Sequence, residues 1–461
     1  MKYPAYRKYK KSSVAWLGEI PEHWETKRAR FLITVNPSSP ILRALDKESE
    51  VSFIPMDAVG ECGGLKLDQT RIVEEIGGGY TEFQNGDVIV AKITPCFENW
   101  KGALANGLEN GAAYGTTELH ILRVSHRINE RFLFYMTLTD GFRKLGEAEM
   151  YGAGGQKRVP PDFCKDFLIP LFPKDEQTAI ADFLDRETSR LDTLVAKKQA
   201  LIGLLKEKRT ALISQTVTRG LPADAAREFG LQPHMRFRDA GVEWLEKVPE
   251  KWENWKMTHA CLKICDGTHF SPKSESSGDY MYITAKNIKE AGIDLKNVTF
   301  VAKEDHNAIY SKCPVRKGDV LYIKDGATAG IATVNMLEEE FSMLSSVALL
   351  RPKAAILEAR YFAYQLNSCT FKDYILKSLV GGAMTRFTIE IISDFRIIVP
   401  DYDEQQAIAN YLDRKITKID NLIAKIEAAI ERLKEYRTAL ITAAVTGKIN
   451  VRTAIVKKEA A

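Results

Sequence analysis

Fragments of catalytic motifs occur in this sequence, and each lacks a residue that its chemistry requires. A phosphate-binding loop needs Gly-x4-Gly-Lys followed by Ser or Thr, but Gly447 and Lys448 stand alone and are followed by Ile449. Amino-methyltransferases hold a flipped base with an Asn-Pro-Pro-aromatic loop. The nearest string, which begins at Asn36, lacks the second Pro and the aromatic residue.

Two carboxylate–lysine pairs resemble part of a nuclease site. They are Asp87 with Lys92 and Asp319 with Lys324. A second metal-binding acid at nuclease spacing is missing from both pairs, so ordinary strand and loop residues are the preferred interpretation. We therefore expect no catalytic residue, no metal and no cofactor bound by this chain.

The seven cysteines are scattered and contain no Cys-x-x-Cys pair. Cys261 and Cys265 lie close in the sequence to His259 and His269, so a zinc site there is an open alternative, although no second ligand pair follows at finger spacing. Free, mostly buried thiols in a reducing compartment are the preferred interpretation.

The bulk composition is that of a soluble protein with several domains. A chain of 461 residues suggests two to four domains. No apolar run reaches the roughly 18 residues of a membrane span, and no signal core follows the basic N-terminus, so we expect a cytoplasmic protein without membrane contact. The net charge of +4 permits nucleic-acid binding but does not demonstrate it.

A shift of 228 residues, from Val14 to Val242, places the second half of the chain on the first. The Trp-Leu pair at Trp16 falls on that at Trp244, and the Arg-Thr-Ala-Leu-Ile string at Arg209 falls on the same string in the second half. Self-similarity at a fixed period indicates a duplicated unit, which permits internal two-fold symmetry.

Both repeats contain a long helical pattern with apolar residues at alternating steps of three and four, as in a coiled coil. At about 38 residues, or on the order of 55 Å, each helix needs a partner, and we expect the two to pair antiparallel; separate packing of each helix on its own globular domain is the alternative. Val195, Ile202, Ile423 and Ile430 widen the two stripes. The predicted pairing residues are Leu184, Leu191, Leu194, Leu201, Leu205 and Leu212 in the first helix, and Leu412, Ile419, Leu422, Ile426, Leu433 and Leu440 in the second.

The remaining segments predict two α+β domains with curved, mixed sheets. Helical stretches are expected at 129–145 and 357–376. The expected strands are 51–55, 87–91, 118–124, 167–171, 280–284, 319–324, 346–351 and 395–399. The predicted segments are an N-terminal segment (1–25), a first domain (26–172), a central helix (173–219), a linker with the repeated N-terminal segment (220–253), a second domain (254–399), a C-terminal helix (400–447) and a tail (448–461).

Two short motifs resemble those of a known family. The string from Trp16 to Trp24 resembles the N-terminal signature of specificity (S) subunits of type I restriction-modification systems. The Glu-Gln-x-Ala-Ile strings at Glu176 and Glu404 resemble that family's entry into its long helices. The resemblance covers nearly the whole chain, including the order of domain, helix, domain and helix.

The resemblance implies a DNA reader with two recognition domains, each bound to one half of an asymmetric, bipartite site. The paired helices would set the spacing and dock two methyltransferase subunits, with restriction and motor subunits joining the larger complex. S-adenosylmethionine, ATP and Mg²⁺ are then expected only on those partners. A scaffold without DNA readout, and an enzyme whose motifs have decayed, remain the alternatives.

Long polar side chains beside Gly-rich or Thr-rich turns are the candidates for contact with double-stranded DNA. Arg and Lys can address guanine, and Asn and Gln can address adenine. The candidates in the first domain are Lys92, Thr94, Asn99, Lys101, Gln156, Lys157 and Arg158, and those in the second are Lys286, Asn287, Lys324, Thr328, Thr385 and Arg386.

Overall fold

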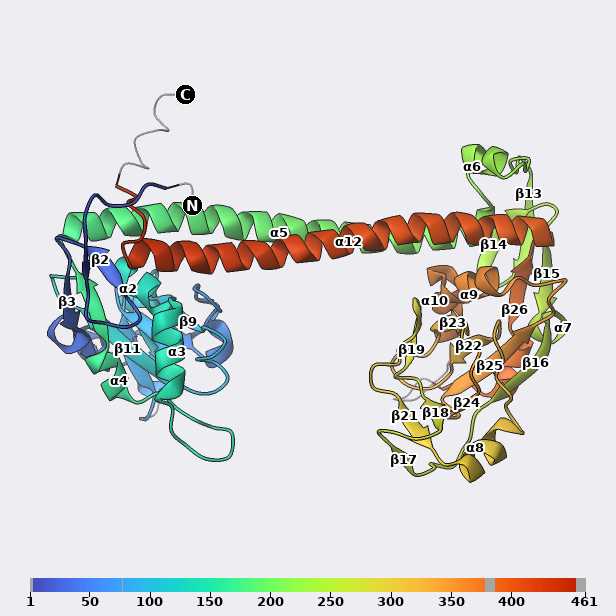
Figure 1. Cartoon of the computed structure of the whole chain (residues 1–461), viewed down its shortest axis with the longest axis horizontal. Coiled ribbons are helices and arrows are strands. Elements are labelled where there is room, and N and C mark those ends of the chain that lie inside the picture. The colour runs from blue at the N-terminus through green and yellow to red at the C-terminus, as the bar shows by residue number, and fades with distance from the viewer. Residues whose placement is uncertain (1–2, 77, 378–385, 453–461) are drawn as a thin grey trace. The chain divides into compact units, whose positions relative to one another are not determined.

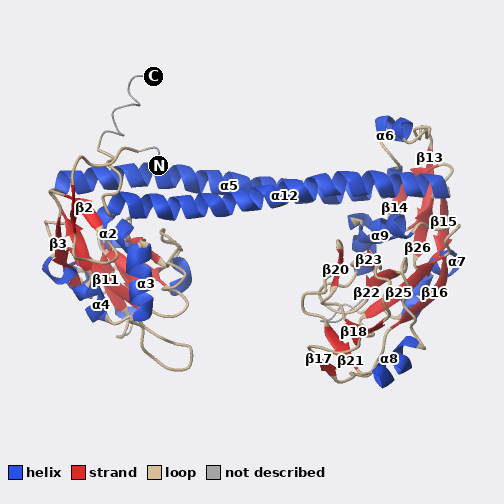
Figure 2. Cartoon of the chain, in the orientation of Figure 1, coloured by secondary structure: helices blue, strands red, loops and turns tan. Residues whose placement is uncertain are grey.

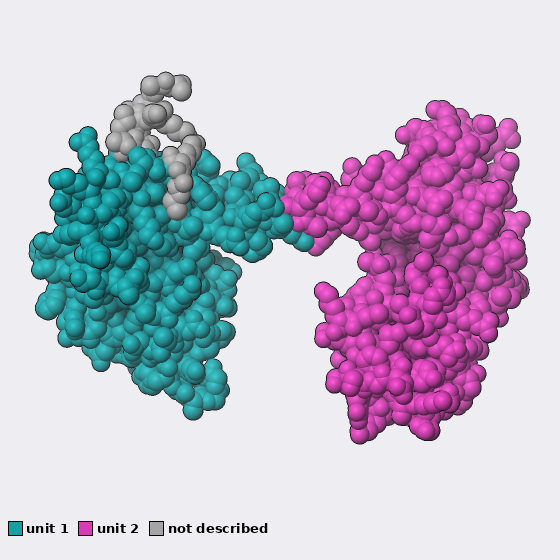
Figure 3. All heavy atoms as spheres, in the orientation of Figure 1, with its two compact units in different colours: residues 1–198, 427–461 teal, residues 199–426 magenta. Residues whose placement is uncertain are grey.

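The computed structural model of the chain describes residues 3–76, 78–377 and 386–452. It divides into two compact units, residues 1–198 with 427–461 and residues 199–426 (Figure 3). Each unit contains one globular domain, here called head 1 (residues 26–172) and head 2 (residues 254–399). Helices α5 (Lys174–Arg219) and α12 (Tyr402–Val445) each contribute one portion to each unit (Figure 1).

Head 1 contains two four-stranded sheets, in the orders β4-β11-β8-β9 and β6-β5-β10-β7. Strands are drawn in red in Figure 2. The first sheet is antiparallel, whereas β10 pairs with β5 in parallel in the second, so the head is mixed as predicted. The bounds are β4 Ile33–Val35, β5 Glu50–Ile54, β6 Thr70–Ile72, β7 Thr81–Gln84, β8 Val88–Ala91, β9 Gly102–Leu104, β10 Ala112–Gly115 and β11 Leu119–Val124.

Head 2 repeats the order of the antiparallel sheet and three strands of the second sheet, but the fourth strand of that second sheet, β17, joins the opposite edge from β7. Its antiparallel sheet has the order β16-β25-β22-β23, and its second sheet, β17-β21-β18-β24, again contains one parallel pair, β18 with β24. The bounds are β16 Cys261–Asp266, β17 Ser274–Glu275, β18 Tyr280–Ile283, β21 Thr299–Val301, β22 Val320–Ile323, β23 Ala332–Val334, β24 Phe341–Met343 and β25 Val347–Pro352, with the hairpin strands β19 Ile288–Lys289 and β20 Gly292–Ile293.

Short two-stranded sheets and helices complete each unit. The paired strands are β1 Tyr9–Lys11 with β2 Glu19–Pro21, β3 Glu25–Arg28 with β12 Leu168–Leu171, β13 Phe237–Val242 with β14 Leu245–Pro249, and β15 Glu253–Lys256 with β26 Arg396–Val399. The helices are α1 Pro40–Ala44, α2 Glu130–Thr137, α3 Asp140–Ala148, α4 Pro161–Asp166, α6 Ala223–Glu228, α7 Met257–Ala260, α8 Lys303–Tyr310, α9 Ala359–Asn367, α10 Cys369–Lys377 and α11 Ile389–Asp394. None of the helices in the described ranges is long and apolar enough to cross a lipid bilayer.

All eight predicted strands are present, but each predicted head helix is split in two. Thr139 ends the first piece in head 1, because its hydroxyl accepts the Phe142 amide hydrogen and starts α3. Ser368 does the same for α10 by accepting from the Phe371 amide. A hydroxyl that bonds the backbone favours a new helix start over continuation of the old one.

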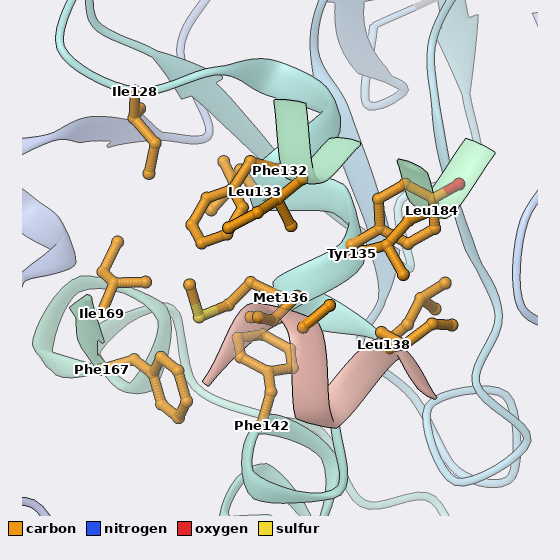
Figure 4. Close-up of a cluster of buried hydrophobic side chains, with 14 of the residues drawn as sticks. Ile128, Phe132, Leu133, Tyr135, Met136, Leu138, Phe142, Phe167, Ile169 and Leu184 are labelled. Atoms are coloured by element: carbon orange, nitrogen blue, oxygen red, sulfur yellow. The ribbon is translucent and has the colours of Figure 1, made fainter. Parts of the chain in front are cut away.

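A large apolar core joins head 1 to both long helices within its unit. Figure 4 shows Phe132 and Met136 of α2 with Phe142 of α3 and Leu184 of α5. Leu440 of α12 belongs to the same buried cluster. Burial of such side chains is the main stabilising contribution to each head, at about 1.5–3 kcal/mol for each side chain.

The two long helices run antiparallel, as predicted. In the first unit the early part of α5, with Leu191, shares a core with the late part of α12, with Leu440. In the second unit the late part of α5, with Ile213, shares a core with the early part of α12, with Leu412. The internal symmetry is visible in two ion pairs that the 228-residue shift interchanges: Arg437 to Asp192, at 3.0 Å, and Arg209 to Asp420, at 3.4 Å.

One column of the predicted helix-pairing residues, formed by Leu194, Leu201 and Leu422, is wrong. Leu194, Leu201 and Leu422 are 41%, 44% and 45% exposed. The residues one position later, Val195, Ile202 and Ile423, are half-buried instead. The other predicted positions are buried or half-buried: Leu184, Leu191, Leu205, Leu212, Leu412, Ile419, Ile426, Leu433 and Leu440.

The same one-residue error occurs in both helices because both carry two adjacent apolar columns. Residues three and four positions apart lie on neighbouring parts of a helix face, so periodicity alone does not decide which column is covered. Tertiary packing buries the β-branched column, which includes Ile430 at 5% exposure, and leaves the leucine column at the surface.

Candidate nucleic-acid interface

In head 1 two distant segments meet at the end of strand β8. The Thr94 amide and hydroxyl donate to the Lys157 carbonyl oxygen at 3.0 and 3.1 Å. The Val159 amide donates to the Lys92 carbonyl oxygen at 2.9 Å, and Ile93 pairs with Arg158 in an antiparallel bridge. The structure therefore brings the two predicted DNA-contacting segments of this head, 92–94 and 156–158, side by side.

Head 2 has the same arrangement at the end of strand β22. The Phe387 amide donates to the Lys324 carbonyl oxygen at 2.9 Å, and Asp325 pairs with Arg386 in an antiparallel bridge. Phe387 corresponds to Val159 under the 228-residue shift, so this contact is part of the repeat. Thr385, a further candidate, lies outside the described residues.

A carboxylate lies beside the arginine in each head, and in head 1 it holds the side chain by hydrogen bonds. Nε and Nη2 of Arg158 donate to the Glu118 carboxylate at 2.9 and 2.8 Å. These hydrogen bonds, aided by the charges of Arg158 and Lys92, lower the pKa of Glu118 against the opposing effect of burial. Arg386 lies 3.5 Å from Oδ1 of Asp325 and is 64% exposed.

An exposed turn projects beside Arg158. Tyr151 and Arg158 exchange backbone hydrogen bonds of 3.2 and 2.8 Å, and the residues between them are exposed. Gly154 and Gly155 have φ values of +63° and +78°, which side chains with a Cβ rarely adopt. The turn presents the candidates Gln156 and Lys157 to solvent.

Two predicted contacts in head 2 are corrected by their burial. Lys324 is 2% exposed, and its Nζ lies 3.3 Å from Asp266 and 3.4 Å from Asp325. Asn287 is buried: its Oδ1 accepts from Thr284, and its Nδ2 donates to the Asp294 carbonyl oxygen. Both side chains stabilise their own head, because a buried polar group needs its partners inside the protein.

The other candidates differ in exposure. Nζ of Lys101 donates to the Met56 carbonyl oxygen at 2.9 Å, which ties this side chain to its own head. Asn99 and Thr328 are exposed in the turns that follow β8 and β22. Lys286 is exposed next to Asn287, in the turn after β18 of the other sheet.

The structure also explains the carboxylates that resembled nuclease residues. Asp87 is 1% exposed and binds Arg123 through two hydrogen bonds of 2.7 Å. Asp319 binds Arg351 in the same way at 2.8 Å. These buried ion pairs belong to the sheets, so the two aspartates support the fold.

The zinc alternative does not fit strand β16. Cys261 and Cys265 lie four residues apart in this strand, which separates them by roughly 13 Å. One zinc ion cannot bind both, because a Zn–S bond is about 2.3 Å. Cys265 instead lies 3.6 Å from Cys313, sulfur to sulfur.

Sequence reasoning missed the carboxylate partners Glu118, Asp266 and Asp325. Glu118 lies 40 positions before Arg158, and no local pattern links the two. Asp325 was the only one of the three that a local signal could have found, because it is the sequence neighbour of the predicted Lys324. The pairs form only when the strands of the antiparallel sheet are in register.

Comparison with known proteins matches this chain to one family. Residues 249–432 match the model described as the type I restriction modification DNA specificity domain. Over these residues the chain is similar to the specificity subunits of type I restriction systems. The resemblance seen in the sequence is thereby confirmed.

Individual relatives support the same assignment. The specificity subunits of the type I restriction enzymes EcoAI and EcoEI of Escherichia coli are 39% and 36% identical over 188 residues, which is 40% of this chain and 31% of each relative. The chain thus matches about a third of the length of these relatives. The MjaVIII specificity subunit of Methanocaldococcus jannaschii is 22% identical over 441 residues, covering 94% of both chains.

Solved structures agree with the fold. A chain from a structure described as the basis of complex assembly and conformational transition of the type I R-M system aligns with a TM-score of 0.65, 19% identity, and coverage of 92% of this chain and 98% of that one. The HsdS subunit from Thermoanaerobacter tengcongensis aligns with a TM-score of 0.53 and 17% identity, covering 93% and 98%. At these identities the likeness concerns the fold alone, and it confirms the predicted α+β heads with long antiparallel helices.

Proposed function

We propose that this specificity-subunit homologue selects the DNA sequence on which a type I restriction-modification complex acts. Each head binds one half of an asymmetric, bipartite site on double-stranded DNA. The paired helices set the spacing and dock two methyltransferase subunits, and restriction subunits join the full complex. The chain itself supplies no catalytic group; S-adenosylmethionine, ATP and Mg²⁺ belong to the partners, and the complex works in the cytoplasm.

The observation that carries this proposal is the repeated pair of segments at the ends of β8 and β22. Each pair presents one arginine, Arg158 or Arg386, beside turns with exposed polar side chains. Arginine is the residue best suited to bidentate recognition of guanine, and its neighbours can contact phosphates. Two such sites in one chain fit a target with two halves.

The exposed leucine column favours the helices as the docking surface. In the second unit, Leu201 and Leu204 of α5 and Leu422 of α12 are all more than 40% exposed, and in the first unit Leu194 is 41% exposed. Exposed leucines of this kind mark surfaces that a partner covers. These leucines are the proposed methyltransferase contacts.

A binding experiment tests the proposal. The chain is purified with and without its methyltransferase subunits, and filter binding is measured with a random-sequence duplex and with the duplex identified by methylation profiling of the host. We expect the complex to bind the identified duplex at least about 1000-fold more tightly, the usual margin of a specific protein over random DNA. Binding that does not discriminate between the duplexes would leave the scaffold alternative in place.

A further inference from the structure

The two tryptophans related by the internal repeat have different environments. In the second unit, Nε1 of Trp244 donates to the Arg396 carbonyl oxygen at 3.1 Å. In the first unit, Trp16 instead stacks on Phe167, with ring centroids 5.1 Å apart and planes at 27°. Its Nε1 is buried and has no hydrogen-bond acceptor among the described residues.

A single glycine explains the difference. Gly141, the second residue of α3, would place a Cβ 2.4 Å from Cε3 of Trp16, so the indole occupies space that any other residue would fill. The second residue of α10 in the other unit is Thr370. There the ring of Trp244 lies against Phe371, edge to face, at 5.4 Å.

A second polar atom nearby has lost its partner in the same way. Ser214 of α5 accepts the Cys369 amide hydrogen at 2.9 Å. Its counterpart on α12 is Thr442, whose Oγ1 is buried and has no partner in the described part of the chain. Both losses occur in the first unit, whereas the second unit satisfies both positions.

Trp16 and Thr442 line one cleft of about 810 Å³ in the first unit. Phe163, Phe167 and Leu145 form its apolar part, and Leu145 is 44% exposed. Carboxylates predominate among the charged groups of the lining, with one lysine against four acids. The charged lining residues are Asp140, Lys144, Glu149, Asp162 and Asp166.

Several of these carboxylates already form ion pairs with basic side chains. Asp166 pairs with Arg28 at 2.9 Å and also with Arg30, and Asp162 pairs with Lys165 at 2.9 Å. Glu149 has no ion pair within the described residues and is free to take a further cation. None of the residues proposed for DNA contact lines this cleft, so it is distinct from the candidate DNA interface.

We propose that this cleft docks a peptide segment of a partner protein, with one large apolar side chain beside a Lys or Arg. A main-chain carbonyl of the segment accepts from Trp16 Nε1, and a main-chain amide donates to Thr442 Oγ1. The apolar side chain fills the space beside Phe163, and the cation meets Glu149. Because both polar atoms are covered in the free protein, docking shifts the rim, of which Leu145 is the exposed part.

Two peptides that differ only in charge test the proposal on the full chain: acetyl-Lys-Phe-Leu-Lys-amide and acetyl-Glu-Phe-Leu-Glu-amide. We expect the lysine peptide to bind with a Kd on the order of 1 mM, as befits a fragment of an interface, and at least tenfold more tightly than the glutamate peptide. Isothermal titration measures both.

Variants connect the binding to the cleft. Gly141→Thr introduces the side chain found in the other unit and should weaken binding of the lysine peptide at least tenfold. Leu145→Asp, a change at an exposed position, should do the same without risk to folding. Trp244→Phe in the second unit is the matched control and should leave the peptide affinity unchanged.

Several results would overturn the proposal. These are no binding of the lysine peptide, equal binding of both peptides, or binding that both cleft variants leave intact. Self-association of the chain that Leu145→Asp abolishes would assign the cleft to a second copy instead. The DNA-binding assay is independent of all these measurements, so a failure there leaves this cleft unaffected.

Discussion

Arg158 and Arg386 occupy matching places in the two heads, and a carboxylate lies beside each. Arg158, whose Nε is engaged by Glu118, presents its remaining N–H groups in a fixed direction. A fixed direction reduces the conformational entropy lost on binding, which favours affinity for a matching base edge.

Replacement of Arg386 by Ala should weaken DNA binding by roughly 1–3 kcal/mol and relax recognition in one half-site only. The reason is the loss of one bidentate base contact in one head. Competition binding with duplexes that vary one half-site at a time provides the measurement. Arg227→Ala, which removes an exposed charge from α6, is the control. Uniform loss across all sequences would reassign Arg386 to phosphate contact.

His120 predicts a pH dependence in head 1. Its Nε2–H donates to the Val159 carbonyl oxygen at 2.8 Å, and its Nδ1 accepts from Asn36 at 3.2 Å, so the ring is neutral. Burial lowers the pKa of His120, and the charge of Lys92 lowers it further. Below the ordinary His pKa of about 6.5 the unfolded chain therefore binds more protons than the folded chain.

The free energy of unfolding of head 1 should consequently fall as the pH drops from about 6.5 through the lowered pKa of His120. Above about pH 6.5 the contribution of neutral His120 to stability is complete. Urea unfolding between pH 4.5 and 8 measures it, with His120→Gln as the comparison. The variant should lack this part of the pH dependence. Parallel curves for the two proteins would show that another group is responsible.

At the scale of elements, the long helices show how one face serves the fold and the adjacent face remains available. The covered column carries β-branched residues such as the half-buried Val195 and the buried Ile430, and the neighbouring column carries exposed leucines. Leu191 and Leu194 lie three residues apart on α5 in the same unit, at 4% and 41% exposure. This pair separates the two roles.

Leu191→Asp should destabilise the first unit by more than about 3 kcal/mol, because it removes a buried leucine and buries a charge. Leu194→Asp should change stability by less than about 0.5 kcal/mol, as exposed substitutions do. Urea unfolding compares the two. If Leu194 lies on the docking surface, its variant should instead weaken methyltransferase binding at least tenfold in co-purification titrations. Equal destabilisation by both changes would contradict the observed burial of Leu191 and exposure of Leu194.

At the scale of the whole molecule, the chain consists of two units with separate cores. Buried residues of head 1, such as Phe132, cluster with their own unit, and those of head 2, such as Phe362, cluster with theirs. Separate cores allow one head to change without loss of the other. This organisation suits a reader of two unlike half-sites.

The separation predicts additivity. The double variant Arg158→Ala with Arg386→Ala should lose DNA-binding free energy equal to the sum of the single losses, within about 0.5 kcal/mol, since distant sites without shared partners are independent. The same filter-binding assay measures all three variants. A double loss well below the sum would mean that the heads do not bind DNA simultaneously.

Local patterns in the sequence were sufficient to predict the repeat, the two long helices and eight strands, among them those that contain Val88 and Val320. Periodicity and turn residues act over a few positions, so one sequence is enough to reveal them. The segments around Lys92 and Arg158 were chosen because Gly-rich turns and long donors are visible without a fold. The structure brings these segments together, and their contact with DNA stays a prediction.

Three features were decided only by the tertiary structure. Packing chose which apolar column of α5 and α12 is buried, strand register joined Arg158 to Glu118, and burial withdrew Lys324 from the surface. Each depends on contacts between residues distant in the chain, and the free energy of such contacts is absent from any local window of sequence.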